Sequence, residues 1–420
     1  MNNENRNKLI NECKKKTINK QKVQKLLREN ININKRDKNS KTALMYASSK
    51  GDEVIVRELI GKGANVNLRN KYNETAFNLA VKKGHMNVVR ILLENGAAID
   101  DKDINGITAL MYASEYNNIE IVQILINSRA EVNLQDNTGL TALAYASIQG
   151  NEQIVQLLIS KGANVNLRNK YNETAFNLAA RRGHINILKI LSKSGAIITN
   201  GGGLIDASYL GYKEVVEFLC RKLSHVNYTI LGKTALMCAS ENNHKEIVQI
   251  LINRGANINL QDNSGKTALM CASENNHKEI VKILINSLAE VNLQDNSGKT
   301  ALMHASINNH IEIVKILINS RADVNLQDNS GMTALIYASF FGQKEIVQIL
   351  INKGANINLQ DNSGTTALMY ANQRQNNIIK KSAYKNIIRI LSINPLHKKT
   401  KNSMKKSTRL GNNVVNPMHN

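Results

Sequence analysis

The sequence repeats itself every 33 residues. The dipeptide Thr-Ala recurs at this step in two series, beginning at Thr42, Thr75, Thr108, Thr141 and Thr174 and resuming at Thr234, Thr267, Thr300, Thr333 and Thr366. Between the two series, residues 201–219 occupy the same place in a degraded form, with Gly202 where the threonine would stand. The chain therefore contains eleven units, and residues 1–33 look like an atypical twelfth. A fixed period of this length predicts stacked structural units.

Residues 262–290 show how one unit is built. The opening segment Asp-Asn-Ser-Gly is typical of a turn, in which Gly265 can adopt a positive φ. Thr267 predicts a helix N-cap, and the pattern that follows predicts helices over about 268–275 and 278–286. In sister units a glycine is expected to end the second helix, as at Gly63, Gly162, Gly255 and Gly354.

These predicted helices are too short to be stable alone. Each spans about eight to ten residues, whereas ~12–15 residues are marginal even for good helix formers. They can persist only by packing on the helices of the next unit. The sequence therefore predicts an all-α repeat solenoid that is stabilised by contacts between neighbouring units.

The repeated pattern D-x-x-G-x-T-A-L-x-x-A-S-x-x-x-x-x-E-I-V-x-I-L-I-x-x-x-A-x-(V/I)-N resembles the ankyrin repeat over about residues 9–394. The resemblance implies stacked helix-turn-helix units of 33 residues with β-turn fingers. One departure is systematic, because the family's T-P-L-H reads T-A-L-M at Thr267–Met270 or T-A-F-N at Thr75–Asn78. The change removes a rigid helix start and a hydrogen bond between turns, so we expect less stability per repeat.

Two segments of the array are identical, which indicates duplication of a block. They span 62–80 and 161–179, which lie 99 residues apart. This duplication and the abundance of Asn, Ile and Lys resemble the expanded ankyrin sets of giant amoebal viruses, intracellular bacteria and protists.

The pattern divides the chain into six segments. We expect an atypical N-terminal capping unit, ankyrin repeats, a degenerate repeat, further repeats, a C-terminal capping repeat with an insertion and a basic disordered tail, over 1–33, 34–200, 201–224, 225–365, 366–394 and 395–420. In the degenerate repeat the turn loses five residues and gains Gly201-Gly202-Gly203, which indicates either a shortened finger or a flexible joint. The capping repeat carries eight extra residues at its helix junction.

Positive charge is concentrated at the two ends of the chain. The net charge is +22, of which residues 1–41 carry +9 and residues 362–420 carry +11, leaving +2 for the body. The tail is basic without acidic residues, through Lys398, Lys399, Lys401, Lys405, Lys406 and Arg409. Such a tail fits a nuclear-import address, nucleic-acid binding, binding to an anionic membrane, or a solvated segment without a partner.

No pattern in the sequence indicates catalysis, a cofactor or a metal. A nucleophile elbow, paired carboxylates and a phosphate-binding loop are all missing, so we do not expect an enzyme. One repeat slot holds His85, His184, His244, His277 and His310. Stacked helices lie ~8–10 Å apart, too far for shared zinc ligands, so these histidines are expected to bond within the stack.

The other composition features predict a reduced, cytoplasmic monomer. Cys238 and Cys271 share a slot in adjacent units, a spacing too long for a disulfide, and are expected to be small residues at the edge of the core. The chain has no apolar run long enough for a membrane span, and its N-terminus has no apolar stretch typical of a signal peptide.

In ankyrin arrays the finger tips and the ends of the first helices line a concave surface and vary freely. By this resemblance the candidate partner-binding residues are Lys50, Lys82, Lys83, Tyr116, Arg181, Arg182, Phe340 and Phe341. The basic members would make the N-terminal half of the groove positive, unless they are ordinary solvated charges. Phe340-Phe341 is either a binding hot spot or core filling.

Three asparagines resemble a modification site. Asn133, Asn292 and Asn325 follow Glu-Val or Asp-Val as in ankyrin sites that animal asparaginyl hydroxylases modify, although an asparagine here can simply bond to its own turn. As a whole, the sequence predicts an interaction module or adaptor whose partner is an unidentified protein, including a host protein. The alternative is nucleic-acid or anionic-membrane binding through the basic ends.

Overall fold

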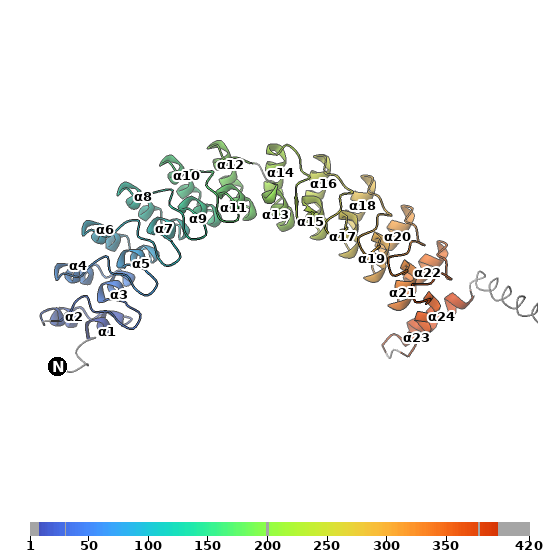
Figure 1. Cartoon of the computed structure of the whole chain (residues 1–420), viewed down its shortest axis with the longest axis horizontal. Coiled ribbons are helices and arrows are strands. Elements are labelled where there is room, and N and C mark those ends of the chain that lie inside the picture. Colours follow the sequence, from blue (N-terminus) through green and yellow to red (C-terminus); the bar gives the residue numbers. More distant parts are fainter. Residues whose placement is uncertain (1–7, 30, 199–200, 377–378, 394–420) are drawn as a thin grey trace, which may run out of the picture. The chain divides into compact units, whose positions relative to one another are not determined.

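The computed structural model describes residues 8–29, 31–198, 201–376 and 379–393. These residues form two units, one within 1–199 and one within 200–420, and each is described by itself. Both consist of consecutive helix pairs, with the first helices in one row and the second helices in another (Figure 1). This is the all-α solenoid of stacked helix-turn-helix repeats that the sequence predicted.

In the N-terminal unit the first helices are α1 (Lys8–Lys14), α3 (Ala43–Lys50), α5 (Ala76–Lys82), α7 (Ala109–Glu115), α9 (Ala142–Gln149) and α11 (Ala175–Arg181). The second helices are α2 (Lys20–Leu27), α4 (Glu53–Gly61), α6 (Met86–Glu94), α8 (Ile119–Asn127), α10 (Glu152–Ser160) and α12 (Ile185–Lys193). The pair α1–α2 packs on α3 and α4, so the atypical first unit closes this end of the stack.

In the C-terminal unit the first helices are α13 (Gly202–Leu210), α15 (Ala235–Glu241), α17 (Ala268–Glu274), α19 (Ala301–Ile307), α21 (Ala334–Phe340) and α23 (Ala367–Arg374). The second helices are α14 (Lys213–Lys222), α16 (Lys245–Asn253), α18 (Lys278–Asn286), α20 (Ile311–Asn319), α22 (Lys344–Asn352) and α24 (Lys381–Ile393). One two-stranded hairpin, β1 (Thr229–Ile230) with β2 (Lys233–Thr234), precedes α15.

The capping threonine fixes where each first helix begins. The Oγ1 atom of Thr267 accepts a hydrogen bond from the backbone N–H of Met270 at 3.3 Å, as the sequence predicted. In return, the Sδ atom of Met270 accepts from the Thr267 N–H at 3.5 Å. In the Thr-Ala-Phe-Asn version, the side-chain oxygen of Asn177 accepts from Thr174 N–H at 3.1 Å. Methionine and asparagine thus give the threonine N–H a partner in the chain's own variant of the motif.

The two helices of a pair and their neighbours share one apolar core. In the repeat at 268–286, Leu269, Ile280, Val281 and Leu284 are almost fully buried. Within each unit, the first helices of adjacent repeats pack more extensively on one another than the second helices do. Tighter packing along one row bends a stack toward that row, so the first helices and their fingers form the concave side of each unit.

The triple glycine of the degenerate repeat is helical and closely packed. Gly202 and Gly203 form the first turn of α13, and Gly201 is its N-cap. A Cβ atom on Gly201 would lie 2.1 Å from the Cβ atom of Tyr228, so a larger residue has no room there. The two units meet in sequence at Thr199 and Asn200, directly before this turn. Whether the shortened segment also acts as a joint stays a prediction.

The eight extra residues of the last repeat are distributed over three places. α23 is one residue longer than α19, and α24 has 13 residues where α20 has nine. The remaining three residues lengthen the connection over 375–380. The sequence placed the whole insertion at the helix junction, whereas most of it extends helices, chiefly at the start of α24.

Candidate protein-binding surface

Most fingers are turns organised by one aspartate, and Asn70 and Asn169 take its place in two of them. In the finger that precedes α9, the Oδ1 atom of Asp136 accepts from the backbone N–H groups of Thr138 and Leu140, both at 2.8 Å. Its Oδ2 atom accepts from the Tyr145 hydroxyl at 2.8 Å, nine residues along the chain. Gly139 completes the turn with φ +87°. We call this arrangement a locked finger, because both carboxylate oxygens are used internally.

Locking recurs along the array. Tyrosine supplies the hydroxyl in the pairs Asp37–Tyr46, Asp103–Tyr112, Asp136–Tyr145, Asp328–Tyr337 and Asp361–Tyr370, and His304 replaces it opposite Asp295. This position, which we call the tyrosine slot, is the one that Cys238 and Cys271 occupy in their repeats. The sequence indicated only that it lies at the edge of the core, not that it bonds to the finger. The nine-residue step from aspartate to tyrosine was the available indication.

Adjacent fingers also bond to one another. The backbone N–H of Asn296 donates to the Ser264 carbonyl at 3.0 Å, and its side-chain amide donates to the Asn263 carbonyl at 2.9 Å. The neighbouring glycine makes this approach possible, since a Cβ atom on Gly265 would lie 2.5 Å from Asn296 N. Within each unit, neighbouring fingers that bond in this way form a hydrogen-bonded edge beside the first helices.

The histidine ladder bonds within the stack. The Nε2 atom of His310 lies 2.9 Å from the Glu274 carbonyl at the end of the previous first helix. The same contact is made by His85, His184, His244 and His277. Asn151 and Gln343 replace it with side-chain amides, and Tyr384 of the capping repeat donates its hydroxyl to Phe340 O. This confirms the structural role predicted for these histidines.

Three of the predicted basic groove residues are engaged internally. Lys50 donates to the carbonyls of Cys13 and Lys15 at the end of α1, and burial lowers its pKa. Lys82 pairs with Glu74 at 3.2 Å, and Arg181 makes the equivalent pair with Glu173. The charges of Lys82 and Arg181 are therefore largely balanced within their own repeats, whereas Lys50 is held by carbonyls of the preceding unit.

The same bridge occurs with its charges exchanged in the C-terminal unit. Lys233 of the finger pairs with Glu241 of α15, and Lys266 pairs with Glu274 of α17, both at 2.6 Å. The helix end is thus basic in some repeats and acidic in others, with the opposite charge eight residues earlier. The same ion pair therefore recurs between finger and helix end, and either partner can carry the positive charge.

Three further candidates are more accessible. Lys83 and Arg182 are exposed at the C-caps of α5 and α11. Tyr116 is 49% exposed and stacks on Tyr112, with ring centroids 6.3 Å apart. These side chains stand at the first-helix ends, where the resemblance placed partner contacts.

Phe340 and Phe341 lie against the capping repeat and are half-buried. Their rings meet edge to face at 4.9 Å, and Phe340 also meets Tyr370 at 5.4 Å. The Arg374 guanidinium lies 3.6 Å from the centroid of the Phe340 ring. The pair is therefore part of an aromatic cluster that holds α23 against α21, and it leaves part of both rings at the surface.

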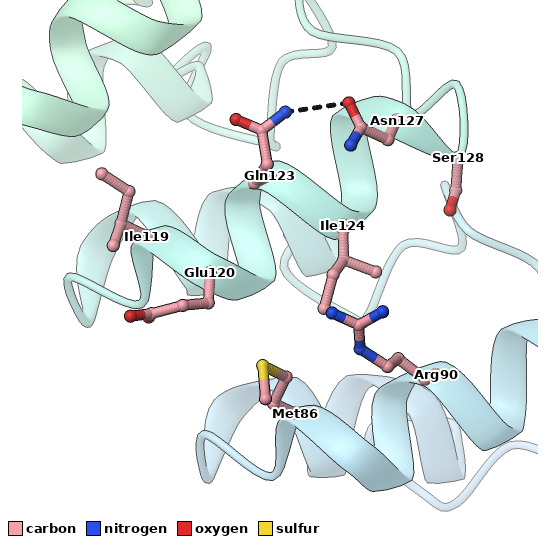
Figure 2. A pocket seen from close by; sticks show the side chains of 8 residues that line it. All are labelled: Met86, Arg90, Ile119, Glu120, Gln123, Ile124, Asn127 and Ser128. Carbon is pink, nitrogen blue, oxygen red and sulfur yellow. Dashed lines mark hydrogen bonds between the residues drawn. The ribbon is translucent and has the colours of Figure 1, made fainter.

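A separate pocket lies on the second-helix row. Met86 and Arg90 of α6 face Ile119, Glu120 and Ile124 of α8 across it (Figure 2). At its far end Gln123 donates to Asn127 at 2.8 Å (Figure 2). No pattern that pointed to the first-helix ends predicted this pocket between α6 and α8.

The cysteines are buried and unreactive in character. All four are free thiols, and burial raises the pKa of Cys13 to about 12 and that of Cys238 to about 11. Among the residues that the structure describes, no group of three or more His, Cys, Asp or Glu could hold a metal ion. In the same residues, no helix combines the length and apolar character needed to cross a bilayer.

The asparagines that resemble hydroxylation sites bridge consecutive repeats. The Oδ1 atom of Asn133 accepts from Asn164 N–H at 2.8 Å, and its amide donates to Gly162 O at 3.0 Å. Asn292 and Asn325 make the equivalent pairs of contacts. Their side chains thus bond to the backbone of the next repeat and not to their own turn alone. The basic tail residues from Lys398 to Arg409 lie outside the described residues.

Comparison with known proteins agrees with this geometry. A family model for ankyrin repeats, three copies to each match, covers residues 12–103, 97–169, 162–230, 204–295, 236–328, 286–361 and 320–391. The chain belongs to the ankyrin-repeat family. Ankyrin repeats are generally protein–protein interaction modules. No curated protein matches this ankyrin array.

Proposed function

We propose that this ankyrin array is an interaction module or adaptor that binds a partner protein through its concave side. The observation that carries the proposal is the contrast between the framework and the first-helix ends. Caps, fingers and inter-repeat bonds recur from repeat to repeat, whereas equivalent helix-end positions hold Tyr209, Glu241, Ile307 and Phe340. A surface whose shape is held by other residues can vary in this way to match a partner.

The variable positions offer the residue types that dominate protein interfaces. Tyr116 and the exposed edges of Phe340 and Phe341 provide aromatic anchors, and Lys83 and Arg182 provide cations. Because Lys82 and Arg181 are paired, the exposed cations beside them are better placed to meet an acidic partner. A host protein is one class of partner that this role would include.

The experiment is affinity capture from the source cells followed by cross-linking, so that the contact surface is mapped. Tyr116→Ala combined with Arg182→Ala should reduce capture at least ~10-fold, the loss expected when interface anchors are removed. Arg90→Ala, in the pocket on the second-helix row, is the matched control and should retain capture. Cross-links confined to the second helices would contradict the proposal.

Phe340→Ala with Phe341→Ala tests the aromatic pair, with unfolding measured in parallel because both rings pack on the capping repeat. Deleting 396–420 tests the role of the tail. If the array is an adaptor, protein capture should survive this deletion. Salt-sensitive DNA binding that disappears with the tail, without any protein capture, would instead favour the nucleic-acid alternative.

A further inference from the structure

An apolar groove opens on the concave side of the C-terminal unit, at the degenerate repeat. It is lined by Ile205 and Tyr209 of α13 and by Ile230 and Leu231 of the hairpin, and we call these two pairs its apolar walls. Cys238 of α15 also lines it. Tyr209 is 52% exposed and Leu231 is 83% exposed, so these walls present apolar surface to solvent.

Two sequence changes create this groove. The hairpin turns through Leu231 and Gly232, whose φ values of +51° and +78° are those of a tight two-residue turn, and this lifts Leu231 to the rim. The tyrosine slot holds Cys238 and Cys271 in the two repeats beside the groove. Cysteine is much smaller than tyrosine, so the space that an aromatic ring fills in other repeats stays open.

The second cysteine also leaves one finger unlocked. The Oδ1 atom of Asp262 accepts from Ser264 N–H and Lys266 N–H at 2.9 Å, as in the other fingers that an aspartate organises. Its slot partner is Cys271, which cannot supply the hydroxyl that tyrosine supplies elsewhere. Within the described residues, Asp262 Oδ2 has no hydrogen-bond donor, and it stands at the groove.

The groove contains one ionised carboxylate that has an oxygen without a donor. Burial acts to raise the pKa of Asp262, but hydrogen bonds from Ser264 and Lys266 outweigh it and lower the pKa, so the carboxylate is ionised at neutral pH. A second acidic residue, Asp206 of α13, also lines the groove, where it has a contact of its own. The cation there, Lys233, pairs with Glu241 at 2.6 Å and also helps to lower the pKa of Asp262.

We infer that this groove binds a segment of a partner protein in which a lysine or arginine stands beside an aliphatic side chain. The aliphatic side chain packs between Leu231 and Tyr209, and the cationic group donates to Asp262 Oδ2. The inference rests on the proposed use of the concave side and names the chemistry of one contact there. A purely polar segment would leave the apolar walls uncovered, and an acidic segment would meet the carboxylate of Asp262.

Two substitutions test the role of Asp262 Oδ2 while the turn bonds to Oδ1 are kept. Asp262→Asn removes the charge, and the chain already tolerates asparagine at this position, since Asn70 Oδ1 accepts from two backbone N–H groups in its own finger. Cys271→Tyr supplies the missing hydroxyl, as Tyr337 does for Asp328. This second variant locks the finger and occupies Oδ2 with an internal donor.

The probe is a phage-displayed library of random 12-residue peptides, selected on the full chain. We expect enriched peptides to carry Lys or Arg beside an aliphatic residue. Calorimetry with the best synthetic peptide should give a Kd at least ~10-fold weaker for Asp262→Asn and for Cys271→Tyr, the loss expected for a charged contact. Asp136→Asn, in a locked finger of the N-terminal unit, is the matched control and should bind normally.

The same measurements can overturn the inference. It is wrong if enriched peptides lack a basic residue, or if Asp262→Asn and Cys271→Tyr bind the peptide as tightly as the parent chain. A merely structural effect is excluded if Cys271→Tyr raises the unfolding midpoint while weakening the peptide. If capture of the cellular partner does not change in Asp262→Asn, this inference is wrong and the adaptor role stands. If the peptide binds but no cellular partner is captured, the adaptor role is wrong and this inference stands.

Discussion

The fingers around Asp328 and Asp262 have the same turn but use their carboxylates differently. In both, Oδ1 accepts from two backbone N–H groups at 2.9 Å. In the first, Oδ2 is held by Tyr337 at 2.5 Å, whereas the second has Cys271 in that slot. One residue, nine positions along the chain, thus decides whether a finger carboxylate supports the fold or faces the surface.

The largest expected effect on stability comes from replacing the turn glycine, which both locked and unlocked fingers contain. Gly265 and Gly364 have φ +79° and +77°, so alanine is strained at either site. Only at Gly265 would the new Cβ also meet the next finger, 2.5 Å from Asn296 N. We expect Gly265→Ala to lower the unfolding free energy by about 3 kcal/mol, because strain and overlap combine.

The matched control is Gly364→Ala, whose Cβ would have nothing within 4 Å. It should cost about 1 kcal/mol from backbone strain alone. Urea unfolding followed by circular dichroism gives both values. Equal losses for the two variants would mean that contact between fingers adds nothing to stability.

Removing the lock should have the next largest effect. Tyr337→Phe deletes the hydroxyl that donates to Asp328 Oδ2 and leaves this buried carboxylate without that donor. A hydrogen bond to a charged group contributes ~1.5–3 kcal/mol, so a loss of about 2 kcal/mol is expected. Tyr171→Phe, on a side chain that is 78% exposed, serves as the control and should change the urea midpoint very little.

Adding a lock to the unlocked finger should have the opposite sign and a smaller size. Cys271→Tyr gives Asp262 Oδ2 the donor that it lacks, for which we expect a gain of about 1 kcal/mol after the loss of side-chain entropy is included. Hydrogen exchange of the Ser264 and Lys266 amides should slow in this variant. A decrease in stability would show that the groove beside Cys238 cannot accept the ring.

The regular part of the fold follows from local patterns in the sequence. The predicted second helix over 278–286 has these limits in the structure, and Thr267 is the N-cap that was expected. Both features depend on interactions within one turn of helix, which a short pattern encodes. The 33-residue period then predicts the same pair of helices in each of the other regular repeats.

The site was harder to predict because its contacts cross from one element to another. Lys50 is recognisable as basic, but its donation to carbonyls of α1 depends on how the first unit packs. Phe340 could be read as anchor or filler, and the structure shows that the capping repeat covers one side of its ring. The triple glycine indicated either a shortened finger or a flexible joint, and only the structure shows that the close approach of Tyr228 requires glycine at position 201.

The smallest predicted effect compares the ends of the second helices. Gly63 and Gly255 end α4 and α16 with φ +86° and +79°, while Leu288 follows α18 in the same slot with φ +68°. A leucine in this conformation is strained, and its side chain is 84% exposed, so it gains little packing in return.

Leu288→Gly should therefore stabilise the chain by about 0.5–1 kcal/mol, the strain relieved less the entropy that glycine loses on folding. The backbone bonds that close this turn, from Leu288 N–H to Ile285 O and from Ala289 N–H to Leu284 O, both at 3.0 Å, do not depend on the side chain. Leu288→Ala is the informative control, because it shortens the side chain and keeps the strain. If the alanine variant gained as much as the glycine variant in urea unfolding, the exposed side chain and not the backbone conformation would be the source of the cost.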